Sequence, residues 1–154
     1  MGSVWGGNGD EVLQGGSLRD RIYAGRGDDI VKGLGGNDKI VGESGRDTLI
    51  GGTGNDVLTG DSSRSSFNDV FVFGKNSGKD IVTDFEVGKD MLQILKGLNG
   101  IKKASDVIDH AKQKGSDVII DLGDGNRIKL KNVSLEDLKK NPGDHFDITK
   151  NLAN

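Results

Sequence analysis

The sequence has 154 residues, of which 26 are glycine, one is proline and none is cysteine. This length fits a single domain, the lack of cysteine excludes disulfides and thiolate metal sites, and no apolar run reaches the ~18 residues that span a membrane. The net charge of −3 argues against nucleic-acid binding, and the two histidines, His110 and His145, leave little material for catalysis.

Six consecutive nonapeptides follow residues 1–5, which we expect to be a linker or a remnant of excision from a longer protein. They run from Gly6 to Thr59 without an insertion, and the eighth position of each is a large aliphatic residue. The fourth position is glycine in five of the six copies, with Leu18 as the exception. The sixth position is always acidic: Glu11, Asp20, Asp29, Asp38, Asp47 and Asp56. Such regularity excludes a flexible linker.

Each nonapeptide predicts a glycine-rich turn followed by a three-residue strand whose middle side chain points inward. Two nonapeptides complete one coil of 18 residues, so strands stack as parallel sheets on both sides of a thin aliphatic core. The predicted fold is all-β: a parallel β-roll over residues 6–83. The inward residues are Leu13, Ile22, Val31, Ile40, Leu49 and Leu58.

The acidic residues then form a ladder along each edge of the roll. Neighbouring rungs lie ~4.8 Å apart, and two unit charges near 4 Å repel by about 4 kcal/mol at an effective dielectric of 20. A cation between the rungs removes this repulsion, and carboxylate and carbonyl oxygens favour calcium. Because the aliphatic core is thin, we predict that the roll is disordered without calcium and folds on binding it.

Beyond residue 60, a polar loop over 61–67 interrupts the repeats. Asp69 and Asp80 precede further strand-like segments and are candidate ligands. If one ion lies between each pair of adjacent turns, the chain binds about four to six ions in all. We expect Asp84, Glu86 and Asp90 to be solvated or structural charges.

Residues 84–148 predict a small β-rich cap with one or two short helices, followed by a tail over 149–154. The expected elements are a strand over 91–95, a helix that Ser105 caps and that runs through Lys114, a hairpin joining 118–122 to 127–131 and a short helix capped by Ser134. The acidic residues of the hairpin favour a turn over a calcium loop, and His145 favours a structural role.

The repeats GLGGNDKIV and GGTGNDVLT resemble the RTX family, whose consensus is GGxGxDxUx. The resemblance implies calcium ligation by the position-six acids and by turn carbonyls around Gly27, Gly36, Gly45 and Gly54. It also implies type I secretion, extracellular location and an uncleaved secretion signal near residues 144–148. Four residues depart from the consensus. Glu11 is expected to bind poorly and to let the first turn fray, and Leu18 puts the turn at 15–20 in question. Arg19 and Arg46 are each expected to weaken a neighbouring ion site.

Two functions follow from this resemblance. The first is a non-catalytic calcium-binding module that stabilises a covalently linked parent protein, such as a mannuronan epimerase, serralysin-type protease, lipase or rhizobial glycanase. The alternative is a calcium-dependent adhesin or extracellular matrix protein.

The outward strand positions add a hypothesis on binding. Arg21, Tyr23 and Lys39 share one face, and cations beside an aromatic ring suit an acidic polysaccharide such as alginate; an ordinary solvated strand face is the alternative. The opposite face is more apolar, and we expect it to pack under the C-terminal segment or a neighbouring domain.

Overall fold

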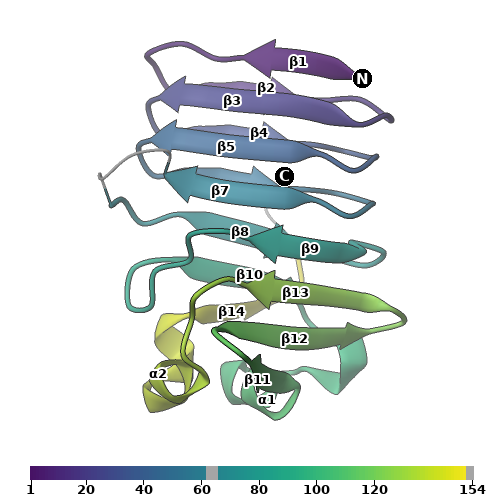
Figure 1. Cartoon of the computed structure of the whole chain (residues 1–154), viewed down its shortest axis with the longest axis vertical. Helices are drawn as coiled ribbons and strands as arrows, with labels where there is room; N and C mark the ends of the chain where they lie inside the picture. The colour runs from purple at the N-terminus through teal and green to yellow at the C-terminus, as the bar shows by residue number, and fades with distance from the viewer. Residues whose placement is uncertain (62–65, 152–154) are drawn as a thin grey trace.

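A computed structural model describes residues 1–61 and 66–151 of the chain. It is a solenoid in which two sheets face each other and short turns join them at both edges (Figure 1). The strands of the eight-stranded sheet, in spatial order, are β1 (Gly2–Trp5), β3 (Asp20–Arg26), β5 (Lys39–Ser44), β7 (Val57–Asp61), β9 (Lys79–Val82), β13 (Asn126–Leu130), β12 (Asp117–Gly123) and β11 (Ala111–Lys114). Those of the six-stranded sheet are β2 (Val12–Gln14), β4 (Ile30–Lys32), β6 (Thr48–Ile50), β8 (Val70–Phe73), β10 (Met91–Leu95) and β14 (Phe146–Thr149).

Strands along the roll pair in parallel at the spacing that the repeats predict. Ile22 lies beside Ile40, and Ile40 lies beside Leu58, each pair being 18 residues apart. In the six-stranded sheet, β2, β4 and β6 have the three residues that each nonapeptide predicts, whereas β3 and β5 of the other sheet extend to seven and six residues. The predicted parallel β-roll is therefore confirmed.

The core is a single file of aliphatic and aromatic side chains between the two sheets. Ile22, Val31, Ile40, Leu49 and Leu58 are fully buried, whereas Leu13 in the first repeat is only half-buried. Leu13 lies in β2, the edge strand of its sheet, so no further strand covers it. Phe71, Val82 and Leu92 continue the file toward the C-terminal end. The inward orientation predicted for position eight is confirmed.

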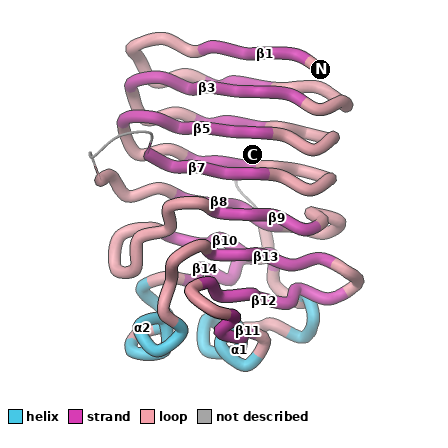
Figure 2. Tube along the Cα trace, in the orientation of Figure 1, coloured by secondary structure: helices cyan, strands magenta, loops and turns pink. Residues whose placement is uncertain are grey.

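The C-terminal part extends both sheets and closes the end of the roll (Figure 2). β13 pairs in parallel with β9, β14 pairs in parallel with β10, and β11 to β13 form an antiparallel meander. The short helices α1 (Ala104–Asp109) and α2 (Leu135–Lys140) lie beside the last strands, together with the 3₁₀ turns η1 (Leu98–Gly100) and η2 (Pro142–Asp144). The strand over 91–95, the hairpin and the helix capped by Ser134 are as predicted.

Two expectations for local structure are wrong. Gly2–Trp5 is a strand and not a linker, because it pairs with β3 and Val4 takes the inward place beside Ile22. The helix expected from Ser105 to Lys114 ends at Asp109, and Ala111–Lys114 form β11 instead. The backbone groups of β11 pair with those of β12 in antiparallel register instead of continuing the helix.

Part of the predicted polar loop over 61–67 falls outside the described residues. The division into a roll over 6–83 and a cap over 84–148 stays a prediction, since both sheets run across residue 83. Within residues 1–61 and 66–151, no helix is long and apolar enough to cross a membrane.

Candidate calcium-binding ladders

The acidic residues at position six lie at the end of each glycine-rich turn, just before the next strand. Asp29, Asp38, Asp47 and Asp56 are at most 2% exposed. Their carboxyl groups point into the turns, so that two columns of carboxylates follow the two edges of the roll. The structure thus brings together the position-six residues of alternate repeats, as the 18-residue coil requires.

One oxygen of each carboxylate is held by the preceding coil. The Oδ1 atom of Asp38 accepts a hydrogen bond from the backbone N–H of Asp20 at 2.7 Å, and that of Asp56 accepts one from Asp38 at 2.7 Å. Asp80 continues this column by accepting from Asp56 at 2.9 Å. The other column has the same pattern, with Asp29, Asp47, Asp69 and Asp90 as acceptors.

The second oxygen has no such partner. The Oδ2 atoms of Asp29, Asp38, Asp47 and Asp56 are buried and lack a hydrogen-bond partner among the described residues. A buried carboxylate oxygen without a partner is strongly destabilising unless a cation or donor compensates it. These four atoms are therefore available to a cation inside each turn.

Glycine at position one makes room for this oxygen. A Cβ atom at Gly42 would lie 2.2 Å from Asp47 Oδ2, and one at Gly51 would lie 2.3 Å from Asp56 Oδ2. Both distances are too short for any side chain. The first glycine of these repeats is thus required by close approach of the carboxylate, a separate reason from turn formation.

Glycine at position four brings successive turns into backbone contact. Gly27, Gly36, Gly45 and Gly54 have φ between 113° and 132°, a region that other residues rarely adopt. A Cβ atom at Gly45 would lie 2.0 Å from the carbonyl oxygen of Gly27 in the coil before it. The edges therefore present carbonyl as well as carboxylate oxygens, all of them hard ligands that suit calcium.

The side chains alone do not enclose an ion. Among the residues described, no three Asp, Glu, His or Cys side chains converge on one point. The carboxylates are spaced one per coil, so an ion held at these edges needs main-chain oxygens to complete its shell. The carboxylate and carbonyl oxygens at these edges are the kind of ligand atom that calcium prefers.

Burial changes the acidity of these groups. It raises the pKa of Asp47 to about 7 and that of Asp56 to about 6, and the neighbouring carboxylate of the same column adds to the rise. Burial also raises the pKa of Asp69 and of Asp80 to about 8. Without a cation these carboxyl groups are partly protonated near neutral pH, whereas a bound cation favours their ionised form.

The first repeats differ from the interior ones. Both oxygens of Asp20 already accept hydrogen bonds, from the N–H groups of Gly2 and Gly16 at 2.7 Å each, and Glu11 accepts one from Gly7. Leu18 lacks the left-handed conformation of the later position-four glycines, as does Gly9. Ligation by Glu11 and Asp20 is thus less supported by the geometry than ligation by the four interior residues.

Position five carries a second series of hydrogen bonds. Asn37 accepts from the N–H of Asn55 at 2.8 Å, and Asp28 accepts from the N–H of Arg46 at 2.8 Å. The guanidinium of Arg46 also forms an ion pair with Asp28 at 2.8 Å, and its side chain is 70% exposed. Arg46 therefore lies outside the turn and neutralises a carboxylate there.

Sequence reasoning missed a ladder residue. Asp90 is 3% exposed and continues the column beyond Asp69, with both of its oxygens bonded to backbone N–H groups. The order Gly88-Lys89-Asp90-Met91-Leu92 repeats the glycine, acid and aliphatic positions of the nonapeptide and is the signal that identifies it. Asp84 is structural too, since it accepts from the N–H groups of Gly60 and Asp61.

The remaining candidates lie away from the ladders. Arg21 and Lys39 are neighbours on the outer face of the eight-stranded sheet, and Tyr23 beside them stacks on Trp5 with ring centres 4.4 Å apart. His145 is 3% exposed and accepts a hydrogen bond from the N–H of Gly88; burial lowers its pKa. The hairpin residue Asn126 donates to the carbonyl of Gly123, as a turn residue does.

Comparisons with known proteins agree with this geometry. The model of the RTX calcium-binding nonapeptide repeat matches residues 5–40 and 32–64 in four copies, so this part of the chain consists of RTX calcium-binding repeats. Among curated protein sequences, none matches the chain significantly.

Solved structures include a similar fold. The extracellular lipase LipA from Serratia marcescens superposes with a TM-score of 0.52 at 17% identity, over 97% of this chain and 40% of the lipase. The chain thus spans well under half the length of that lipase. Two subunits of the mannuronan C5-epimerase from Azotobacter vinelandii are also found, with TM-scores of 0.44 and 0.41 at 19% and 21% identity. They cover 80% and 94% of this chain, and the matches extend over 71% and 91% of the subunits.

Proposed function

We propose that this calcium-binding module folds only when calcium fills the turns of its β-roll, and that it thereby stabilises a secreted parent protein. The observation that carries the proposal is the set of four buried, unpartnered Oδ2 atoms on Asp29, Asp38, Asp47 and Asp56. A fold that buries four such oxygens is unfavourable until a cation binds them.

The proposed ligands combine carboxylates with main-chain oxygens. In each interior turn the Oδ2 atom supplies one ligand, and turn carbonyls around Gly27, Gly36, Gly45 and Gly54 supply others. The remaining candidates, before and after these interior turns, are Glu11, Asp20, Asp69 and Asp80. One ion between adjacent turns gives a total of about four to six, in keeping with flexible oxygen shells.

Calcium acts in this proposal as a structural ion. It neutralises the carboxylate columns and joins one coil to the next, and the module has no reaction of its own to perform. RTX repeats are typical of secreted proteins, and extracellular modules bind calcium at about 10⁻⁴–10⁻³ M. Such an affinity leaves the sites empty inside a cell and fills them outside, which couples folding to export by a type I system.

Calorimetric titration with calcium, followed in parallel by circular dichroism, tests this proposal. We expect cooperative binding of about four to six ions together with a gain of β-sheet signal. Magnesium, which demands a more rigid octahedral shell, serves as the control ion and should give little of either. Full β-sheet signal in the presence of a chelator would refute the proposal.

A further inference from the structure

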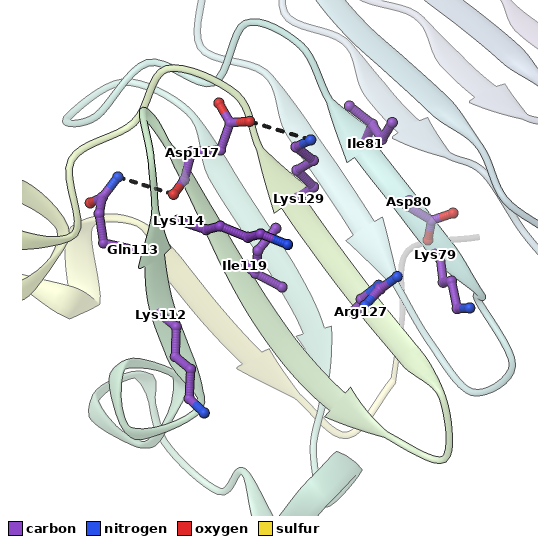
Figure 3. Close-up of a pocket in the computed structure, with 10 residues that line it drawn as sticks. All are labelled: Lys79, Asp80, Ile81, Lys112, Gln113, Lys114, Asp117, Ile119, Arg127 and Lys129. Atoms are coloured by element: carbon purple, nitrogen blue, oxygen red, sulfur yellow. Dashed lines mark hydrogen bonds and ion pairs between the residues drawn. The ribbon is translucent and has the colours of Figure 1, made fainter.

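The outer face of the eight-stranded sheet is hollowed where its last four strands meet. The hollow has a volume of about 570 Å³ and runs across β9, β13, β12 and β11 (Figure 3). Its floor includes Ile81 and Ile119, which are half-buried. We call this feature the basic hollow, after the five cationic side chains that line it: Lys79, Lys112, Lys114, Arg127 and Lys129.

The register of the strands explains why the cations gather there. Arg127 lies beside Lys79, and Lys112 faces the same side of the sheet two strands beyond Lys129, with Ile119 between them. Alternation along each strand places every one of these side chains on the outer face. Residues separated by 50 positions in the chain thus form one cationic surface.

Little negative charge opposes this surface. Lys129 pairs with Asp117 at 3.3 Å, but within residues 1–61 and 66–151 no ion pair engages Lys79, Lys112, Lys114 or Arg127. The other acidic residue of the lining, Asp80, is 2% exposed and its Oδ1 is bonded to the backbone of Asp56. The free cations therefore present a positive field to solvent.

A polar extension adjoins the basic hollow. A second depression shares Lys79, Lys112 and Arg127 and continues over the hairpin turn, where Asp121 and Asp124 line it. Carboxylates beside free cations suit a ligand that offers hydroxyl donors as well as anionic groups. Sugar acids carry both kinds of group on one chain, whereas phosphate polymers offer mainly negative charge.

We propose that the basic hollow binds a linear acidic polysaccharide, with sugar carboxylates on the cations and hydroxyl groups on the hairpin carboxylates. No aromatic side chain lines the hollow in the described part of the chain, so the stacking platform of single-stranded nucleic-acid binders is missing. The half-buried isoleucines of the floor do not protrude as a membrane-inserting face does. This site is separate from Arg21 and Lys39, because β7 with Val57 and Thr59 lies between them.

Titration with hyaluronan oligosaccharides at saturating calcium tests the proposal. The charge-reversed double variant Lys112→Glu/Arg127→Glu should bind at least about tenfold more weakly than the unmodified chain. A second variant, Lys112→Gln/Arg127→Gln, should show a smaller loss. The matched control Lys32→Glu/Lys150→Glu changes the net charge equally outside the hollow and should alter the affinity less than about twofold.

The comparison ligands decide between sources of the negative charge. Neutral dextran should not bind. Tighter, mutation-sensitive binding of dextran sulfate, duplex DNA or anionic vesicles than of hyaluronan would overturn the proposal, and so would equal losses in the control variant. The proposal rests on the proposed function in one respect: the basic hollow exists only when the eight-stranded sheet is folded. Circular dichroism of each variant in calcium therefore separates a failure of this site from a failure of the proposed function.

Discussion

At the scale of single residues, the two oxygens of a ladder aspartate have different tasks. Oδ1 of Asp38 joins two coils by accepting the N–H of Asp20, and its Oδ2 is buried without a partner. The hydrogen bond to Oδ1 needs only an acceptor oxygen, whereas the proposed binding of a cation by Oδ2 needs a negative charge. The two tasks can thus be separated by replacing aspartate with asparagine, which keeps an acceptor and removes the charge.

We expect Asp38→Asn to raise the calcium midpoint of folding by about tenfold or more, since it removes a proposed ligand charge from an interior turn. Calcium titration monitored by circular dichroism measures this midpoint. Asp124→Asn is the matched control, because Asp124 lies in the exposed hairpin turn with φ of 53°, which asparagine tolerates. Equal shifts in the two variants would refute the assignment of the ladder.

Glycine at position one provides a second test at this scale. Gly42→Ala places a methyl group 2.2 Å from Asp47 Oδ2 and 2.8 Å from the carbonyl oxygen of Gly60. We expect it to lower the free energy of unfolding in calcium by about 1–3 kcal/mol, the usual range for overpacking. Gly143→Ala meets no atom within 4 Å and should leave the stability nearly unchanged. Urea denaturation compares them, and a smaller effect at Gly42 than at Gly143 would contradict the close approach.

At the scale of elements, the sequence predicts the strands of the nonapeptide repeats. It does not predict the strands outside the repeats that pair with the same sheet. Position eight of the repeats identifies the buried core side chains, because one inward residue recurs every nine positions. β1 was missed although Val4 stands 18 residues before Ile22, since a single strand without a turn carries no period of its own. β11 was missed because its pairing with β12 is a tertiary interaction that local helix propensity does not contain.

The candidate site was predictable to a similar extent. The position-six acids of the regular repeats were identified, since their spacing alone places them on two edges. Asp90 lies beyond an irregular segment, so the nonapeptide-like order from Gly88 to Leu92 stands apart from the six regular repeats, and the bond to Asp69 is what places Asp90 in the ladder. The basic hollow could not be foreseen, because Lys79 and Lys112 meet only through the pairing of β9, β13, β12 and β11.

The start of α1 gives a test at this scale. The side chain of Asp106 accepts hydrogen bonds from the N–H groups of Lys102 and Lys103, whereas Ser105 lies inside the helix and is not its N-cap. We expect Asp106→Ala to lower the melting temperature more than Ser105→Ala does, because only Asp106 accepts from the N–H groups that precede the helix. Thermal unfolding in calcium measures both, and a larger loss for Ser105→Ala would restore the original assignment of the cap.

At the scale of the whole molecule, the buried carboxyl groups make the stability of the calcium-free fold depend on pH. Burial raises the pKa of Asp47 to about 7 and those of Asp69 and Asp80 to about 8, against 3.8 for the ordinary group. As the pH rises, the unfolded chain therefore loses these protons first. The free energy of unfolding must fall between about pH 4 and pH 8.

We accordingly expect the calcium-free chain to gain β-sheet signal on acidification from pH 8 to pH 5. The calcium-loaded chain should respond in the opposite direction, because protons compete with calcium for the same carboxylates. His145, whose pKa is lowered by burial, opposes folding only as the pH falls below its ordinary value of 6.5. Circular dichroism across this range checks the prediction, and a pH-independent calcium-free spectrum would contradict it.

The central claim is that calcium holds successive coils together, and amide hydrogen exchange tests it most directly. The N–H groups of Asp38 and Asp47 donate to the carboxylates of the next coil, Asp56 and Asp69. We expect these amides to be strongly protected in calcium and to exchange at nearly the unfolded rate in a chelator. Equal protection under both conditions would show that the roll stands without the ion.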